Sequence, residues 1–536
     1  MLSRILIPLL LCVASVQAQV LPDPVAEELR SRLEAAPVPV ELVVEGESID
    51  SPENLVSFYQ RRVYQPAWSH KKGLLREAGD LIRSLHKANE EGLYPEEYHL
   101  VTLERIVSQL RQASWDQRAV DPEARAVLDL LLTDAFLTYA KHLFQGRVRS
   151  EKEMDSVALL EKALNEKEIS KTLERLLPVH SAYARLRHAL ARYREIGEQG
   201  GWFSVAVQPP LKKGDTGEAV IALRRRLEAE GVSFPKPLPE EVFDDILEEE
   251  IQLFQRRHGL EPDGVVGNST LEALNVSVED RIHQIELNME RWRWMPEDLG
   301  KRRVQVNIAS FELEVLEKEE SVIKMRVIVG RSYRQTPVFS DKIRYLVLNP
   351  HWYVPRMIAV NDLLPEIQQD PSVLQRKKIR VYEGNEGEIR EVDLATIDWT
   401  QVTPSNFRYR LQQDPGANNA LGRIKFMFPN PYDVYLHDTP SQELFERTVR
   451  NFSSGCIRVE KPLELAEYLL RGDSRWNPAK LQTAIDRGTE QTVRLPEPVS
   501  IHLLYWTAWV DSDGAVQFRN DLYGRDRDLA LTLQIH

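Results

Sequence analysis

Cysteine is nearly absent from this chain, which has 536 residues and two cysteines, Cys12 and Cys456. So few thiols exclude a disulfide-stapled fold and a zinc site built from thiolates. A basic surplus is absent too, because 82 acidic residues outnumber 69 basic ones and give a net charge of −13. This charge argues against a nucleic-acid binder, which needs a basic surface. The sequence also lacks metal-ligand motifs such as His-Glu-x-x-His, and we expect no metal site and no cofactor.

A long apolar run occurs only at the N-terminus. Arg4 precedes the apolar segment Ile5–Val13, and small residues lead to Ala18. This pattern predicts a secretory signal peptide over residues 1–18 that is cleaved after Ala18. No later stretch has the length of a membrane span, so we expect an exported protein with no transmembrane segment in its mature chain. Cleavage would leave Cys456 as the only thiol, either a buried filler or a working nucleophile.

The rest of the chain is too long for one hydrophobic core and predicts about three units. Residues 22–201 have apolar side chains at helical spacing and predict a helical domain, with Ala124–Phe144 as its clearest amphipathic helix. A second unit is expected over residues 211–275, where a Gly214–Gly217 turn and an Asp263-Gly264 turn separate short helices. This second unit resembles the small three-helix peptidoglycan-binding domain, which implies binding to the cell wall.

After a connecting helix expected over residues 276–300, the pattern changes to β-strands. Segments with alternating or β-branched residues begin at Arg303 and recur to the C-terminus, with a hairpin around Asp511–Gly514. We therefore assign residues 301–536 to a mostly-β domain. A charged segment over about residues 357–412 interrupts the strands and is too long for an ordinary connection, so we expect a small folded cap with a helix over 361–368.

The β region contains the residues with the clearest chemistry. His437 ends a predicted strand, and Cys456 follows a Ser453-Ser454-Gly455 turn, with a helix expected over 441–450 between them. A thiol becomes a nucleophile when a neighbouring base takes its proton, and His is the usual base. Gly455 permits a tight turn that leaves N–H groups free for an oxyanion. Arg458 lies two residues beyond Cys456 and is suited to hold a substrate carboxylate.

This segment resembles the signature of the L,D-transpeptidase catalytic domain. The matching residues are His437, Thr439, Ser453, Gly455, Cys456 and Arg458, and Asp438 stands where glycine is commoner. Pro415, Gly416, Asn419, Leu421 and Gly422, together with Asn349–Pro355, also match the family. The resemblance implies a multidomain α+β protein of the large periplasmic type. Such a protein has a helical N-terminal scaffold, a peptidoglycan-binding domain and a mostly-β catalytic domain with an inserted cap.

The family's mechanism implies a role for each site residue. Cys456 would attack a peptidoglycan tetrapeptide stem and release D-alanine, while His437 accepts and returns the proton. A diaminopimelate amine of a neighbouring stem would then take the acyl group, which contributes to cell-wall biogenesis and cell shape. Arg458, Tyr435, Gly455 and Ser454 are expected to contact the substrate. The expected partners are stem peptides, glycan and other cell-wall synthesis enzymes, and a carbapenem is expected to acylate Cys456.

Several alternatives stay open at this point. Water as the acceptor would make the protein a carboxypeptidase or endopeptidase, and a lipoprotein lysine would make it an anchoring enzyme. A non-catalytic wall-binding scaffold would leave the lone thiol beside His437 unexplained. A serine enzyme of the penicillin-binding type is disfavoured, because its Ser-x-x-Lys matches have no partner motifs in a sensible order.

Overall fold

The computed structural model describes residues 23–34, 42–70, 73–116, 121–148, 152–235, 240–384 and 388–534. The signal peptide predicted over residues 1–18 lies outside this described part. The chain divides into two compact units, residues 1–177 and residues 178–536. The helical segment expected over 22–201 is therefore divided, and its last helix, α8 (Ser181–Glu198), lies in the second unit. Among the described residues, no helix has the length and apolar character needed to cross a membrane.

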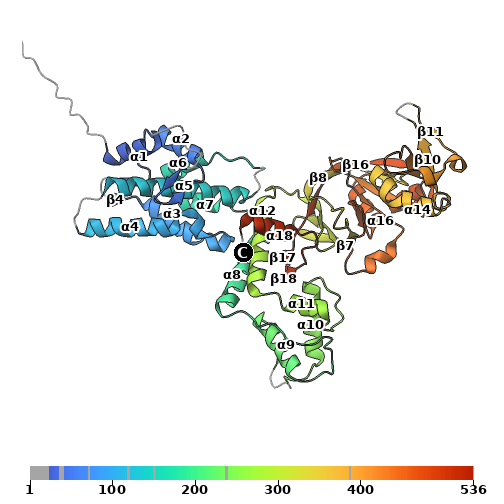
Figure 1. The fold of residues 1–536 in the computed structure, drawn as a ribbon, viewed down its shortest axis with the longest axis horizontal. Helices are drawn as coiled ribbons and strands as arrows, with labels where there is room; N and C mark the ends of the chain where they lie inside the picture. Colours follow the sequence, from blue (N-terminus) through green and yellow to red (C-terminus); the bar gives the residue numbers. More distant parts are fainter. Residues whose placement is uncertain are drawn as a thin grey trace, which may run out of the picture. The chain divides into compact units, whose positions relative to one another are not determined.

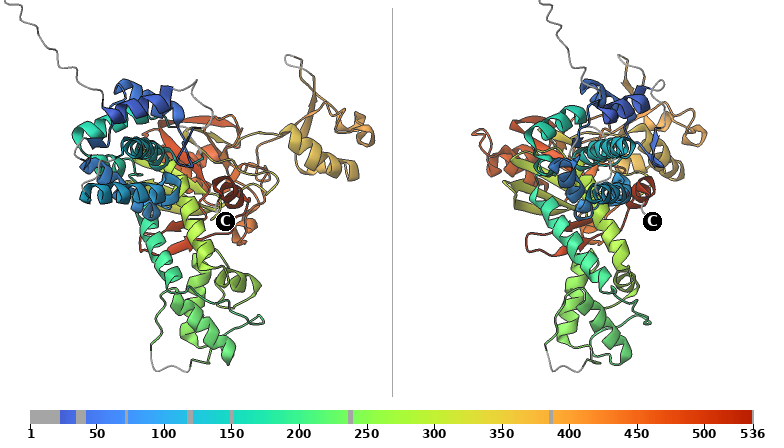
Figure 2. Two further views of the ribbon diagram at one scale, coloured as in Figure 1. Left: turned by 60° about the vertical axis from the view of Figure 1, so that its left-hand side comes forward. Right: turned by 90° about the vertical axis from the view of Figure 1, so that its left-hand side faces the viewer.

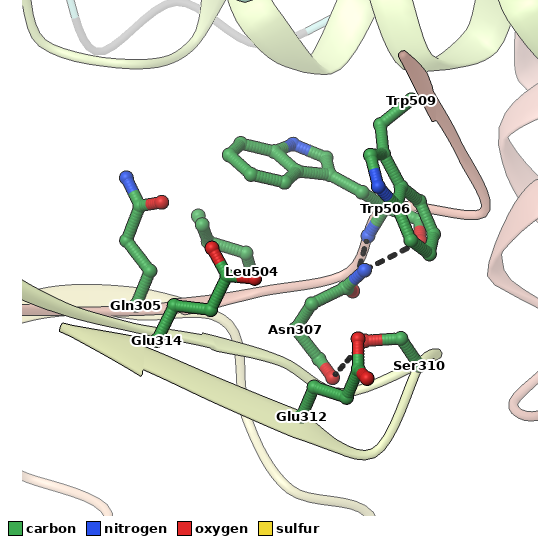
Figure 3. A pocket seen from close by; sticks show the side chains of 8 residues that line it. All are labelled: Gln305, Asn307, Ser310, Glu312, Glu314, Leu504, Trp506 and Trp509. Atoms are coloured by element: carbon green, nitrogen blue, oxygen red, sulfur yellow. Dashed lines mark hydrogen bonds between the residues drawn. The ribbon is translucent and has the colours of Figure 1, made fainter. Parts of the chain in front are cut away.

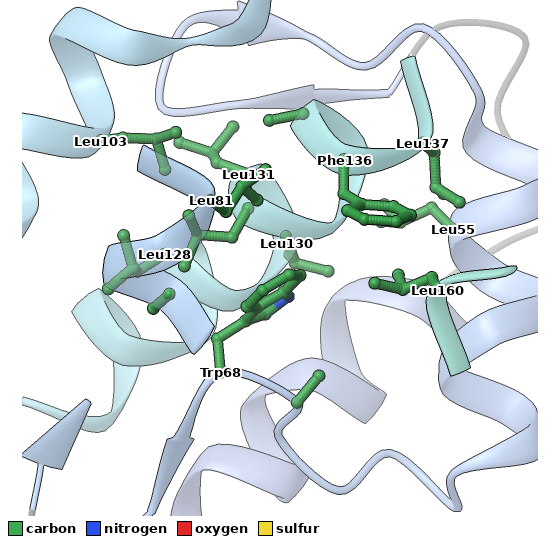
Figure 4. Close-up of a cluster of buried hydrophobic side chains, with 14 of the residues drawn as sticks. Leu55, Trp68, Leu81, Leu103, Leu128, Leu130, Leu131, Phe136, Leu137 and Leu160 are labelled. Carbon is green, nitrogen blue, oxygen red and sulfur yellow. The ribbon is translucent and has the colours of Figure 1, made fainter. Parts of the chain in front are cut away.

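The first unit is a bundle of helices around one buried helix, α5 (Pro122–Gln145) (Figure 1). The sequence predicted an amphipathic helix here, but α5 is buried on nearly all sides, so this prediction was wrong. Its polar residues Asp129, Thr133 and Asp134 are also buried, because neighbouring segments surround them and supply hydrogen bonds. Figure 4 shows the apolar side chains of α5 packed with Trp68, Leu81 and Leu103 from neighbouring segments.

The other elements of this unit surround α5. The helices are α1 (Pro24–Glu34), α2 (Pro52–Arg61), α3 (Arg76–His86), α4 (Leu100–Trp115), α6 (Ser156–Glu166) and α7 (Ile169–Glu174). Short 3₁₀ turns are η1 (Ala88–Glu91) and η2 (Pro95–Tyr98), and two short hairpins are formed by β1 (Val43–Val44) with β2 (Glu47–Ser48) and by β3 (Ser69–His70) with β4 (Gly73–Leu74).

The second unit contains a small domain of three helices. They are α9 (Glu218–Ala229), α10 (Asp245–Arg257) and α11 (Asn268–Leu274), and they enclose a core that includes Leu223, Ile251 and Phe254. Gly214 and Gly217 both have positive φ, of 93° and 119°, which a residue with a Cβ rarely adopts. These glycines shape the turn before α9, as the sequence predicted. A long helix, α12 (Val278–Arg293), follows and packs against α8.

The mostly-β domain is a closed barrel of eight strands in the order β13-β14-β15-β7-β6-β5-β16-β8. The strands are β5 (Arg302–Asn307), β6 (Glu312–Glu317), β7 (Glu320–Ile328), β8 (Phe339–Leu348), β13 (Ile424–Met427), β14 (Leu436–His437), β15 (Ile457–Val459) and β16 (Gln491–Leu504). Alternate residues such as Val304 and Val306 point inward and form the core, because side chains alternate along a strand. The expected hairpin is β17 (Ala508–Val510) with β18 (Val516–Phe518).

Three helices complete the barrel domain: α16 (Pro462–Leu470), α17 (Pro478–Asp486) and α18 (Arg525–Leu533). The helix predicted over residues 441–450 is absent. The chain forms only a 3₁₀ turn there, η6 (Gln442–Glu446), and continues as a loop to Ser453. Because β14 and β15 are adjacent and parallel, the chain must return along the barrel before it enters β15, and this turn and loop make that return.

The insert between β8 and β13 folds around its own core. Its sheet has the order β11-β10-β12-β9, formed by β9 (Trp352–Tyr353), β10 (Ile379–Glu383), β11 (Arg390–Glu391) and β12 (Arg410–Gln413). Its helices are α13 (Arg356–Ile358), a π-helical turn η3 (Ala359–Leu363), α14 (Leu364–Gln369) and α15 (Val373–Arg376), and two 3₁₀ turns are η4 (Leu394–Thr396) and η5 (Trp399–Gln401). Ile367, Val381 and Leu411 lie in this core. The left view of Figure 2 shows the insert projecting from the barrel.

Candidate active site

The barrel places His437 and Cys456 on adjacent strands. β14 runs parallel to β15, with Leu436 opposite Ile457 and His437 opposite Arg458. The N–H of Ile457 donates to the carbonyl of Tyr435 at 3.1 Å, so the pairing continues to Tyr435 beside Cys456. Because alternate residues share a face, Tyr435, His437, Cys456 and Arg458 lie on one side of the two strands. The structure therefore brings together four of the predicted site residues.

The turn before Cys456 is held by hydrogen bonds. Gly455 has φ of 117°, a conformation that favours glycine. The Ser453 hydroxyl donates to the carbonyl of Cys456 at 2.5 Å and accepts from the N–H of Gly455 at 3.2 Å. The amide of Gly455 is therefore engaged. The N–H of Cys456 forms no hydrogen bond within the described residues, and it is the amide beside the thiol that remains open to a substrate oxygen.

His437 is a neutral base with one nitrogen already occupied. Its side chain is 5% exposed, and its Nδ1 lies 2.5 Å from the carbonyl oxygen of Asp438. A carbonyl only accepts hydrogen bonds, so Nδ1 carries the proton and Nε2 has a free lone pair. Burial, with the positive charge of Arg458, lowers the pKa of His437 to about 3. The ring therefore stays unprotonated at neutral pH and is able to accept a proton.

Asp438, the departure from the family pattern, uses its side chain to hold the segment next to His437. Its carboxylate accepts the N–H groups of Arg423 and Thr439, each at 2.7 Å. The N–H of Asp438 donates to the carbonyl of Ile424 at 2.9 Å. Gly422 lies against this carboxylate, and a Cβ added there would be 2.3 Å from the Asp438 Cγ. Asp438 and Gly422 therefore fit each other, and together they fix the carbonyl that orients His437.

The Cys456 thiol is partly buried, and it is protonated at neutral pH. Burial raises the pKa of Cys456, although the N–H and hydroxyl of Tyr435 donate to the sulfur and the charges of Lys425 and Arg458 act in the opposite direction. In this structure the thiol donates to the carbonyl of Asp433, with Sγ 3.8 Å from the oxygen. No hydrogen bond joins Cys456 to His437 in the described chain, and catalytic contacts are often long before substrate binds.

Two cations beside the thiol lack an anionic partner among the described residues. Arg458 has a buried Nε with no hydrogen-bond partner there. Lys425, on β13 opposite His437, forms no ion pair there either. Lys425 was not predicted from the sequence, because a lysine in a strand gives no signal without knowledge of the strand pairing. The site is therefore electropositive around the thiol.

Ser454 contacts the insert indirectly. Its hydroxyl accepts from Nη1 of Arg334 at 3.0 Å, and the same guanidinium forms an ion pair with Asp362 of η3, with Nη2 3.0 Å from Oδ1. Arg334 therefore connects the insert to the turn that carries Cys456.

A separate pocket on the outer face of the barrel contains no such chemistry. It has a volume of about 80 Å³ and includes Trp506 and Trp509 together with Glu312 and Glu314 (Figure 3). Both carboxylates pair with Lys324, at 3.2 and 3.4 Å. Among the described residues, no group of three or more His, Cys, Asp or Glu side chains is placed to hold a metal ion.

Comparison with known families agrees with the three-part organisation. Residues 53–190 match the model of a scaffold domain, residues 216–274 match a "Putative peptidoglycan binding domain", and residues 301–483 match the L,D-transpeptidase catalytic domain. A curated protein of Haemophilus influenzae named "Putative L,D-transpeptidase" is 36% identical over 258 residues, which are 48% of this chain and 50% of that protein. The chain thus spans about half the length of this relative.

Two solved structures are also similar to this chain. The L,D-transpeptidase from Xylanimonas cellulosilytica is 16% identical, with a TM-score of 0.19, and covers 55% of this chain and 98% of its own. The one from Stackebrandtia nassauensis is 13% identical, with a TM-score of 0.21, and covers 55% and 97%. With TM-scores this low, the similarity to the L,D-transpeptidase catalytic domain is based on the family model over residues 301–483.

Proposed function

We propose that this chain, whose residues 301–483 belong to the L,D-transpeptidase family, cross-links peptidoglycan through an acyl-enzyme on Cys456. The observation that carries the proposal is that the partly buried thiol of Cys456 lies on an adjacent strand to His437, a neutral histidine with a free Nε2. A mostly protonated thiol needs a base during attack, and His437 has the required protonation state.

The reaction has two acyl-transfer steps. Cys456 attacks the carbonyl between the third and fourth residues of a tetrapeptide stem, and the thiol proton passes to Nε2 of His437. The carbonyl oxygen gains negative charge, which the N–H of Cys456 is placed to stabilise. His437 returns the proton to the leaving amine, D-alanine departs, and a thioester remains. An amine of a second stem then attacks the thioester, forms the new amide and releases the thiol.

The other parts of the chain support work on the cell wall. The match of residues 216–274 to a peptidoglycan-binding domain supports retention of the enzyme on its polymeric substrate. Export to the periplasm follows from the predicted signal peptide and from the location of that substrate. The folded insert, tied by Asp362 and Arg334 to the Cys456 turn, supports a role in excluding water from the thioester, which would favour an amine acceptor over hydrolysis.

Mass spectrometry with a carbapenem tests the nucleophile. The wild-type protein should gain the mass of one carbapenem, and Cys456→Ala should gain none while it keeps the wild-type circular dichroism. An equal adduct on the Ala variant would refute the assignment of Cys456. Muropeptide analysis after incubation with purified sacculi then identifies the acceptor: cross-linked dimers support transpeptidation, and tripeptides alone would contradict it.

A further inference from the structure

Lys425 is a cation in contact with the aromatic ring beside the nucleophile. It lies on β13 directly opposite His437 in the antiparallel register. Its Nζ is 3.8 Å from the centroid of the Tyr435 ring, and the hydroxyl and N–H of Tyr435 donate to the Cys456 sulfur. The ammonium and the thiol therefore both interact with Tyr435.

Among the described residues, no carboxylate forms an ion pair with the ammonium of Lys425. The charges that act on it are those of Cys456, Glu490 and Asp433, in that order. Arg326 and Arg303 of the barrel are matched by carboxylates, Glu446 and Glu460 for the first and Glu319 for the second. The buried Arg450 donates instead to backbone carbonyls, and Lys425 has neither kind of hydrogen bond among the described residues. Burial lowers the pKa of Lys425, as expected when water is removed from a charge without a full replacement.

An unmatched, half-buried cation next to a nucleophile favours a negatively charged ligand. Removing an ammonium from water is unfavourable unless an anion or hydrogen-bond acceptors compensate. The π-face of Tyr435 compensates in part and fixes the direction of the ammonium. A carboxylate that arrives with the substrate supplies the rest, and its attraction is strong because water is partly excluded.

We propose that Lys425 is a carboxylate-binding residue of the donor subsite and holds the acid group nearest to the carbonyl that Cys456 attacks. This inference rests on the proposed function, in which the donor loses D-alanine. The carboxylate of D-alanine lies next to the scissile amide, so a cation that contacts the same tyrosine as the sulfur is positioned to bind it. Arg458, on the other side of His437, remains available for a second acid group of the stem.

Alkylation of the thiol tests the charge preference without any peptide substrate. A chain with Cys12→Ser has Cys456 as its single thiol, and its rates with iodoacetate and iodoacetamide are measured at pH 7 and low salt. The two reagents deliver nearly the same group but differ in charge. Lys425→Met should lower the ratio of the iodoacetate rate to the iodoacetamide rate by about tenfold or more, because only iodoacetate carries the negative charge that the ammonium attracts. A tenfold change corresponds to about 1.4 kcal/mol. Added salt should reduce the wild-type ratio.

Two further variants are the controls. Lys425→Arg keeps the charge and should keep the ratio within about threefold. Lys461→Met removes one charge from a lysine paired with Glu464 and should leave the ratio unchanged. A retained iodoacetamide rate in Lys425→Met indicates an intact site. An unchanged ratio in Lys425→Met would overturn the assignment. If both rates also fell by the same factor, Lys425 would be a stabiliser of the thiolate.

Donor peptides then connect the subsite to the reaction. A tetrapeptide with a C-terminal carboxylate should acylate the wild type with a lower KM than its carboxamide, and Lys425→Met should abolish this difference with little change in kcat. A difference that persists in Lys425→Met would overturn the proposal. If neither peptide acylates the wild type, the proposed function fails, and the alkylation ratio still decides the role of Lys425.

Discussion

Replacing Gly422 with Ala tests how Asp438 positions the catalytic histidine. The new Cβ would lie 2.3 Å from the Asp438 Cγ, and Gly422 has φ of 62°. The left-handed conformation alone costs about 1–2 kcal/mol for a residue with a Cβ. Displacement of the carboxylate weakens its hydrogen bonds to the Arg423 and Thr439 amides, and a bond to a charged group is worth about 1.5–3 kcal/mol. Together these effects predict that the free energy of unfolding falls by about 2.5–5 kcal/mol.

In an Asp438→Gly background, Gly422→Ala should lower the free energy of unfolding by only about 1–2 kcal/mol, which is the cost of the left-handed backbone conformation. The two substitutions are thus expected to be coupled by about 1.5–3 kcal/mol, and calorimetry of the barrel domain's transition in all four proteins measures this coupling. The carbapenem acylation rate should fall about 100-fold in Gly422→Ala, because the carbonyl that orients His437 moves. Equal destabilisation by Gly422→Ala in both backgrounds would refute the fit between Asp438 and Gly422.

Three further predictions concern the base, the insert and the first unit. The rate of carbapenem acylation should stay level from about pH 5 to pH 7, because a His437 pKa of about 3 keeps the ring neutral. A fall in this rate centred near pH 6.5 would contradict the lowered pKa. His437→Ala should shift alkylation of the thiol to higher pH. Replacing residues 357–412 by a short Gly/Ser linker should keep thiol reactivity but move the muropeptide products from dimers to tripeptides. Arg334→Ala should shift the products in the same direction by a smaller amount. An unchanged ratio of dimer to tripeptide in both variants would show that the insert does not influence which acceptor reacts. Burial raises the pKa of Asp129 to about 6, above its unfolded value near 3.9, so its contribution to the free energy of unfolding should be lost as pH rises from about 4 to 6. Urea unfolding should show a smaller fall in this free energy over that interval for Asp129→Asn than for the wild type. An equal fall in both proteins would contradict the raised pKa.

Local sequence determined much of this protein. The helical spacing before residue 201, the Gly214–Gly217 turn and the alternating segments after Arg303 each predicted the observed type of structure, because these signals depend on near neighbours. The Cys456 segment with its glycine also indicated the L,D-transpeptidase catalytic domain, whose family model matches residues 301–483. The insert was predicted as a folded unit from its length, its helical start and its charged middle, and it has its own core.

Tertiary structure decided what near neighbours do not determine. The helix expected over 441–450 became a 3₁₀ turn, since the parallel pairing of β14 and β15 sets where the chain must return. The surroundings of α5 turned a predicted amphipathic helix into a buried one. Lys425 lies opposite His437 only because β13 pairs with β14, and Asp438 meets Gly422 only through the same pairing. Strand register is a long-range property, so the residues that electrostatically tune and orient the catalytic pair emerged only from the folded barrel.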